Sequence, residues 1–133
     1  MIDEMSLAAW FKELAVLGTR PDGTPYRKLG DGSVGFISDV TGEPGAKIEM
    51  RALAAGFIPE RYVRNMNSFT MAEQSKLLSG SAAVIGLGGL GGYVVELLAR
   101  AGVGKLYIAD FDDFDESNLN RQILATFESV HFS

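Results

Sequence analysis

Apolar residues near the N-terminus recur with the period of an α-helix. One helix face with the i, i+3, i+4, i+7 spacing is formed by Leu7, Trp10, Phe11, Leu14 and Leu17. The spacing predicts a helix over residues 4–17, ended by Gly18. Residues 33–41 and 44–55 predict two more short helices, which Thr41-Gly42 separates. We therefore expect residues 1–59 to form a mainly helical region.

A different pattern begins at residue 60. Thr70 and Glu73 form a capping-box pair, which indicates the start of a helix. Short apolar runs then alternate with a helical pattern, and the first run has the composition of a strand buried on both faces. The predicted elements are a helix at 71–79, a strand at 82–85, a helix at 90–101 and a strand at 105–109. This order is a parallel βαβ unit, so we expect an α/β fold: an incomplete Rossmann-like nucleotide-binding unit over residues 60–133, with a helical N-terminal extension.

The turn between the first strand and its helix is rich in glycine. Residues 86–91 fit the G-x-G-x-x-G pattern. In that pattern Gly86 allows the sharp turn, Gly88 allows the backbone to approach a phosphate, and Gly91 allows the helix to pack close to the strand. The following helix N-terminus offers free N–H groups and a partial positive charge to an anion. The alternative is a loop that only turns the chain.

Asp110 follows the second strand directly. A carboxylate in this place can accept hydrogen bonds from ribose hydroxyls, at about 20 residues from the glycine turn. These features predict a nucleotide without saying which one. An NAD-linked oxidoreductase is therefore an alternative at this stage.

Composition and charge exclude several other classes. The chain of 133 residues has 12 Lys and Arg against 17 Asp and Glu, a net charge of −5, which argues against a nucleic-acid partner. It has no cysteine and one histidine, His131, so disulfides, thiolate chemistry and a zinc site are not expected. No apolar run reaches the length of about 18 residues that a membrane span needs, and the N-terminus is acidic where a signal peptide would be basic. We expect a cytoplasmic protein with no metal site and no membrane partner.

Two segments allow a second interpretation. The helix–Thr-Gly–helix layout of residues 33–56 is compatible with a DNA-binding helix-turn-helix, or with an αα-hairpin that covers an apolar surface. Its second half offers only Lys47 and Arg51 as cations, which favours the hairpin. The acidic run 112–116 suggests a calcium loop but lacks the ligand spacing and turn glycine of an EF-hand.

The segment after the second strand carries the most specific pattern. Asp110-Phe111-Asp112 is followed by Ser117-Asn118-Leu119-Asn120-Arg121-Gln122. Upstream lie Gly-x-Gly-Gly-x-Gly at residues 86–91 and Arg61-Tyr62-Val63-Arg64. In this order the motifs resemble those of the ThiF/MoeB/HesA adenylyltransferases, a family related to the ubiquitin-activating enzymes. The resemblance covers about residues 60–126.

The resemblance implies an ATP-dependent reaction. Such enzymes bind ATP with Mg²⁺ and a small ubiquitin-fold sulfur-carrier protein that ends in Gly-Gly. The tail carboxylate attacks the α-phosphate, giving an acyl adenylate and pyrophosphate. Some relatives activate other carboxylates, including that of a modified tRNA base or a peptide. The resemblance also implies a homodimer with two shared sites.

Roles for individual residues follow from the same resemblance. Arg121 contacts the triphosphate beside Asn118, Asp110 holds the ribose, and Arg64 reaches into the ATP site of the other subunit; Arg121 and Arg64 are the candidate catalytic residues. The candidate nucleotide-binding set is Gly86, Gly88, Gly89, Gly91, Asp110, Asp112, Asn118 and Arg121. The alternatives are that Arg121 pairs with a carboxylate among residues 110–116, that Asn118 is only a cap, and that Arg64 is only solvated.

The chain also departs from the family. The family's essential lysine and its magnesium-binding aspartate lie beyond the segment matched here, and the chain has no thiol for a thioester. We therefore expect the N-terminal portion of such an enzyme, with a region at 1–59 and a partial nucleotide-binding domain at 60–133. A catalytically inactive nucleotide-binding or dimerisation fragment is the alternative to an active enzyme.

Overall fold

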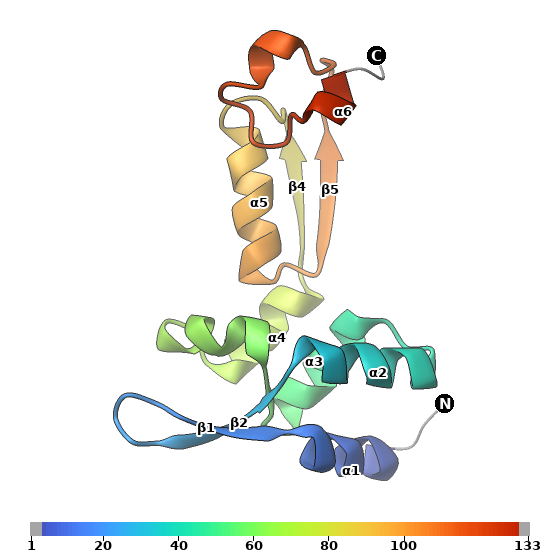
Figure 1. Ribbon diagram of the computed structural model, residues 1–133, viewed down its shortest axis with the longest axis vertical. Coiled ribbons are helices and arrows are strands. Elements are labelled where there is room, and N and C mark those ends of the chain that lie inside the picture. The colour runs from blue at the N-terminus through green and yellow to red at the C-terminus, as the bar shows by residue number, and fades with distance from the viewer. Residues whose placement is uncertain (1–3, 131–133) are drawn as a thin grey trace. The chain divides into compact units, whose positions relative to one another are not determined.

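A helix and a β-hairpin open the first part of the chain. The computed structural model describes residues 4–130, beginning with α1 (Glu4–Leu14). Strand β1 (Val16–Thr19) then pairs antiparallel with β2 (Pro25–Leu29) (Figure 1). In the turn between them, the Asp22 carboxylate accepts a hydrogen bond from the Thr24 N–H at 2.9 Å. His131, the lone histidine, lies outside the described residues.

The prediction of a mainly helical region is wrong for the hairpin. Leu17, which we assigned to the face of the first helix, lies in β1 with 72% of its surface exposed. The spacing from Leu14 to Leu17 fits a helix by coincidence at the point where the helix ends. The turn residues after Thr19 bring two short segments side by side, and pairing between them satisfies the backbone groups that a longer helix would have used.

The other predicted helices of this part are confirmed. They are α2 (Asp31–Thr41), α3 (Gly45–Ala54) and α4 (Met71–Ser79). Gly42 closes α2 with a left-handed φ of 70°. Thr70 and Glu73 form the predicted capping box, in which Thr70 Oγ1 accepts from the Glu73 N–H and Glu73 Oε2 accepts from the Thr70 N–H.

One main apolar core lies in this part of the protein. Strand β3 (Ile58–Pro59) joins β2 in parallel, giving the sheet order β1-β2-β3. Side chains from α1, β2, α2, α3 and the residue before β3 form the core: Leu7, Phe11, Leu29, Val34, Ile37, Ile48, Ala52 and Phe57. A smaller cluster joins α3 to the 3₁₀ helix η1 (Glu60–Asn67) and α4.

The second part of the chain contains the predicted βαβ unit. Strand β4 (Ser81–Ile85), helix α5 (Gly91–Ala101) and strand β5 (Lys105–Ala109) follow one another, and the two strands pair in parallel from Ser81↔Lys105 to Ile85↔Ala109. The short helices η2 (Glu116–Asn118) and α6 (Phe127–Val130) come after the sheet. The α/β class and the parallel unit are confirmed.

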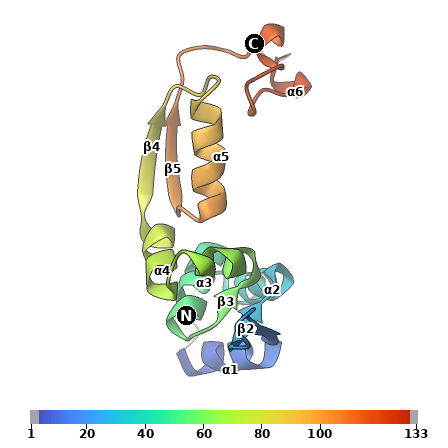
Figure 2. The same cartoon turned by 90° about the vertical axis from the view of Figure 1, so that its left-hand side faces the viewer.

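Burial of this sheet differs from the expectation. Helix α5 covers one face of the two strands (Figure 2). Ile85 is 76% exposed, and Tyr107 and Ile108 are each 54% exposed. The prediction of a strand buried on both faces is therefore wrong for the described residues, because they supply only one covering layer.

The chain divides into two compact units, residues 1–78 and residues 79–133. We predicted a boundary between residues 59 and 60. In the structure η1 and α4 pack with the first unit, since Tyr62 and Leu78 share a buried cluster with Leu53 of α3. Among residues 4–130, no helix combines the length and apolar character that a membrane crossing requires.

Candidate nucleotide-binding site

The glycine turn has the geometry that its sequence predicted. Gly86 adopts a φ of 85°, a region that favours glycine, and its N–H donates to the Ala109 carbonyl at 2.8 Å. A Cβ placed on Gly91 would lie 1.7 Å from the carbonyl oxygen of Gly86. The sharp turn at Gly86 and the close approach at Gly91 are therefore confirmed.

The middle of the turn is open. A Cβ on Gly89 would meet no atom within 4 Å, and one on Gly88 would meet only Nε2 of Gln122, at 3.9 Å. The packing of the protein itself does not require glycine at either position. Room beside the backbone at the start of α5 is what a phosphate group needs in order to reach the N–H groups there.

Asp110 bridges the turn and the segment after β5. Its Oδ1 accepts from the Asp112 N–H at 2.9 Å, and its Oδ2 accepts from the Leu87 N–H. These hydrogen bonds, that from Asp112 first, lower the pKa of Asp110 below its ordinary value. The carboxylate predicted to hold a ribose thus also fixes the position of the glycine turn.

Asn118 caps a short helix. Its Oδ1 accepts from the Asp115 N–H at 2.8 Å, while the Asp115 Oδ1 accepts from the Ser117 N–H at 2.8 Å. The hydrogen bond from Ser117 lowers the pKa of Asp115. The capping alternative is therefore observed for Asn118, and a contact between its amide and a nucleotide stays a prediction.

Arg121 is held by its own segment. One guanidinium nitrogen, Nη1, donates to the Ser117 carbonyl at 2.8 Å and to Oδ1 of Asn120 at 3.0 Å. Across residues 4–130, no ion pair joins it to a carboxylate. The alternative pairing with residues 110–116 is thus not observed, and the rest of this planar group is available to an anion.

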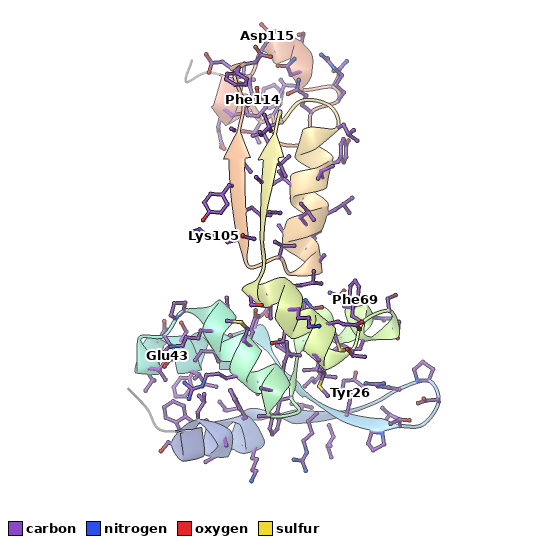
Figure 3. The ribbon with its side chains drawn as sticks, turned by 180° about the vertical axis from the view of Figure 1, so that it is seen from behind. Tyr26, Glu43, Phe69, Lys105, Phe114 and Asp115 are labelled. Carbon is purple, nitrogen blue, oxygen red and sulfur yellow. The ribbon has the colours of Figure 1, made fainter. Side chains whose placement is uncertain are left out.

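Most of the predicted nucleotide-binding residues line one cleft of about 770 Å³. It lies beyond the carboxyl ends of β4 and β5, where Figure 3 shows Phe114 and Asp115. Such ends are where open parallel sheets bind ligands. The lining consists of Gly86, Leu87, Gly88, Asp110, Phe111, Asp112, Asp113, Phe114, Asp115, Asn118, Arg121, Gln122 and Ser129. Gly89 and Gly91 belong to the same turn but are not part of the lining.

Two properties of the cleft were not predicted from the sequence: the excess of carboxylates over cations, and an exposed aromatic side chain. Aspartates outnumber its single cation, Arg121, so an anionic ligand meets repulsion as well as attraction. Phe111 is 95% exposed, and its flat ring gives the cleft a surface on which a nucleobase can stack. Its place directly after Asp110, just beyond the end of β5, was the available signal in the sequence.

The Arg61-Tyr62-Val63-Arg64 motif has two separate environments in the first unit. The Arg61 Nε–H donates to Oδ1 of Asp31 at 3.2 Å and lies 3.2 Å from Oε1 of the buried Glu49. The Tyr62 hydroxyl donates to Oε2 of Glu49 at 3.3 Å. Tyr62 is thus buried, and the half-exposed Arg61 side chain lies against the buried carboxylate of Glu49.

Arg64 faces an open cleft of about 350 Å³ between the hairpin and η1. It is exposed, and no ion pair involving it is found among residues 4–130. Its guanidinium is thus available to an anionic ligand. The contact with a second subunit stays a prediction.

The buried tyrosine predicts a specific response to alkaline pH. Burial, followed by the nearby charge of Glu49, raises the pKa of Tyr62 to about 12 from an ordinary 10.0. Between these values the unfolded chain releases a proton that the folded chain keeps. Stability is therefore full below pH 10 and falls as pH rises toward 12, by roughly 2 kcal/mol from this group.

We expect Tyr62→Phe to remove this part of the fall in the free energy of unfolding at alkaline pH. Near neutral pH the same substitution should lower that free energy by about 1 kcal/mol, because the hydrogen bond to Glu49 is missing. Urea unfolding of both proteins at neutral and at alkaline pH measures the difference. An equal alkaline loss in the two proteins would contradict the assignment.

Comparison with known proteins agrees with the motifs. Residues 62–132 match the sequence pattern of the ThiF family. The chain belongs to the ThiF family. It is 47% identical over 72 residues to the sulfur carrier protein ThiS adenylyltransferase of Escherichia coli (strain K12), covering 53% of this chain and 29% of that protein. It is 44% identical over 54 residues to the tRNA threonylcarbamoyladenosine dehydratase of Bacillus subtilis (strain 168), covering 41% of this chain and 21% of that protein.

The chain spans less than a third of the length of these two relatives. A solved structure extends the likeness across both units. The crystal structure of selenomethionine PaaA matches 90% of this ThiF-family chain and 51% of its own, with a TM-score of 0.51 and 23% sequence identity. At that identity the match shows a shared fold.

The described residues contain no group of three or more metal-binding side chains placed to hold an ion.

Proposed function

We propose that this chain supplies the ATP-binding front half of an adenylyltransferase, which activates the carboxylate of a small protein as an acyl adenylate. The observation that carries the proposal is the cleft beside the glycine turn. The turn leaves room at Gly89, beside the start of α5, and Arg121 brings a guanidinium without a carboxylate partner among the described residues. These groups suit a polyphosphate.

Adenylyl transfer brings two anions together, the attacking carboxylate and the triphosphate. Cations must offset this repulsion, and the cleft holds Arg121 amid several aspartates. A second cation is needed, and Arg64 of a second copy is our candidate because it is exposed and not ion-paired within residues 4–130. This favours a homodimer that shares its sites.

The two relatives described above are named for different substrates. One matched relative is named for a sulfur carrier protein and the other for a tRNA. We propose a small ubiquitin-fold sulfur-carrier protein with a Gly-Gly tail, since the net charge of −5 does not suit tRNA. The proposed compartment is the cytoplasm.

The acidic cleft also favours a second candidate, a module that binds nucleotide without catalysis. Such a module would bind ATP but release no pyrophosphate when the carrier protein is added. An NAD-linked oxidoreductase, in contrast, would bind the dinucleotide in preference to ATP.

Calorimetry with ATP on this chain tests the proposal. We expect saturable ATP binding and none of NAD. Arg121→Ala should weaken binding by about 10- to 100-fold, the cost of a hydrogen bond to a charged group, and Asp110→Ala should weaken it as well. Arg100→Ala on α5 is the control, since Arg100 pairs with Glu96 and does not line the cleft.

Equal affinity of all three variants, or a preference for NAD, would overturn the proposal. Pyrophosphate release with the carrier protein then separates an active enzyme from the binding module.

A further inference from the structure

Strand β1 forms one edge of the β1-β2-β3 sheet, with β2 as its only neighbour in the described sheet. Its register with β2 pairs Thr19 with Pro25. Since proline has no N–H, this pair cannot exchange two hydrogen bonds. Hydrogen-bonded and non-hydrogen-bonded pairs alternate along an antiparallel ladder. The neighbouring pair, Arg20 and Thr24, is hydrogen-bonded, because the Arg20 N–H donates to the Thr24 carbonyl at 2.9 Å.

The alternation fixes the direction of the backbone groups in β1. Val16 and Gly18 direct their N–H and C=O groups toward β2, and Leu17 and Thr19 direct theirs outward. No hydrogen bond to the outward groups is found among residues 4–130. The edge can therefore accept a further strand.

The side chains beside this edge are apolar and basic. Leu17 is paired with Arg27 across the hairpin, so their side chains lie on the same face of the sheet. With Lys12 and Ala15 at the end of α1, they line a cleft of about 570 Å³. Val16 and Leu17 are 58% and 72% exposed.

The charge of this cleft runs against that of the whole chain. Its lining brings two cations, Lys12 and Arg27, and no carboxylate, in a protein with a net charge of −5. The Arg27 guanidinium lies 5.9 Å from the ring centre of Phe57, which supports it from one side. Neither cation forms an ion pair within the described part of the chain.

We propose that the β1 edge binds an acidic peptide segment in extended conformation, as an added strand. The outward backbone groups of Leu17 and Thr19 would pair with the peptide backbone, which gives affinity without regard to sequence. Lys12 and Arg27 would select carboxylates on the alternate residues that face them. The apolar surface of Ala15 and Leu17 would contact the aliphatic parts of the peptide side chains that lie between these two cations.

A peptide fits this surface better than a nucleic acid does. The outward edge offers an alternation of donors and acceptors, and a phosphate chain would leave the carbonyl groups without donors. The inference does not depend on nucleotide binding, because all four lining residues belong to the first unit.

The test uses the full chain and a short fluorescein-labelled peptide in which glutamate alternates with valine and threonine. The matched probe carries lysine at each glutamate position. We expect fluorescence anisotropy to show saturable binding of the acidic probe alone, weakened by added salt. The double variant Lys12→Glu/Arg27→Glu should lower the affinity by about tenfold or more, while Lys105→Glu in β5 should leave it unchanged.

A backbone variant separates strand addition from simple charge attraction. Leu17→Pro removes an outward N–H that the fold itself does not use, at an edge position that tolerates proline. It should weaken binding by about tenfold, with an unchanged circular dichroism spectrum. The proposal would be overturned if the lysine probe bound as tightly as the acidic probe. It would also be overturned if the double charge variant and Leu17→Pro both kept full affinity. The proposal would also be overturned if neither probe bound and the chain instead formed a concentration-dependent dimer that these variants abolished, because the edge would then pair with a second copy.

Discussion

Gly91→Ala should unfold the second unit or weaken it by more than about 4 kcal/mol. The added Cβ would lie 1.7 Å from the oxygen and 2.7 Å from the carbon of the Gly86 carbonyl. These are backbone atoms of the turn itself, so no side chain can rotate to relieve the overlap. The start of α5 would have to leave β4, and losses of this size arise from such backbone conflicts.

Gly89→Ala is the matched control for this change. The two glycines belong to one turn, but a Cβ on Gly89 meets nothing within 4 Å. Its unfolding free energy should stay within about 0.5 kcal/mol of the parent. Its ATP affinity should fall, because the methyl group occupies the space proposed for the nucleotide.

Urea unfolding followed by circular dichroism, together with calorimetry, measures both properties for the two variants. A stable Gly91→Ala protein would contradict the geometry of the turn. A Gly89→Ala protein that binds ATP normally would instead remove Gly89 from the site while leaving the fold intact.

Arg61→Met should have the second large effect, a loss of about 2–4 kcal/mol in the first unit. Glu49 is 3% exposed, and within the described residues no hydrogen bond reaches its Oε1, so the Arg61 charge at 3.2 Å is its main compensation. Removing that charge leaves a buried carboxylate unpaired, which costs more than the pair contributes. The loss lies below that of a fully buried pair because Arg61 is half-exposed.

The penalty should depend on pH and on Glu49. Burial is the main cause that raises the pKa of Glu49 above its ordinary 4.5. As pH falls through that raised value the carboxyl takes up a proton and becomes neutral, so the Arg61→Met penalty should shrink. Adding Glu49→Gln should recover most of the loss at neutral pH for the same reason.

Lys28→Met is the control, because it removes an ion pair without leaving a buried charge unpaired. Lys28 pairs with Glu60, which is half-exposed, and surface pairs contribute about 0–1 kcal/mol. Urea unfolding at neutral and mildly acidic pH distinguishes the cases. An Arg61→Met protein no less stable than Lys28→Met would show that Glu49 is not a buried charge that needs a partner.

The amino-acid sequence by itself determined the second unit closely. The glycine turn and the two strands are local patterns whose meaning depends on residues a few positions apart, so they can be recognised without tertiary information. The order of the motifs also determined the family. The sharp turn at Gly86 and the close approach at Gly91 were predictable as well, because φ and space at a turn depend mainly on the chain beside it.

Tertiary structure decided what depends on distant residues. The strand β2 of the hairpin at residues 16–29 also pairs with β3, a contact that helical spacing around Leu17 cannot reveal. Arg61 and Arg64, three residues apart in one motif, have different surroundings because Glu49 arrives from another helix. Periodicity in the sequence indicates which face of one helix or strand is apolar. Burial and charge balance depend instead on which residues from different elements come into contact in the folded protein.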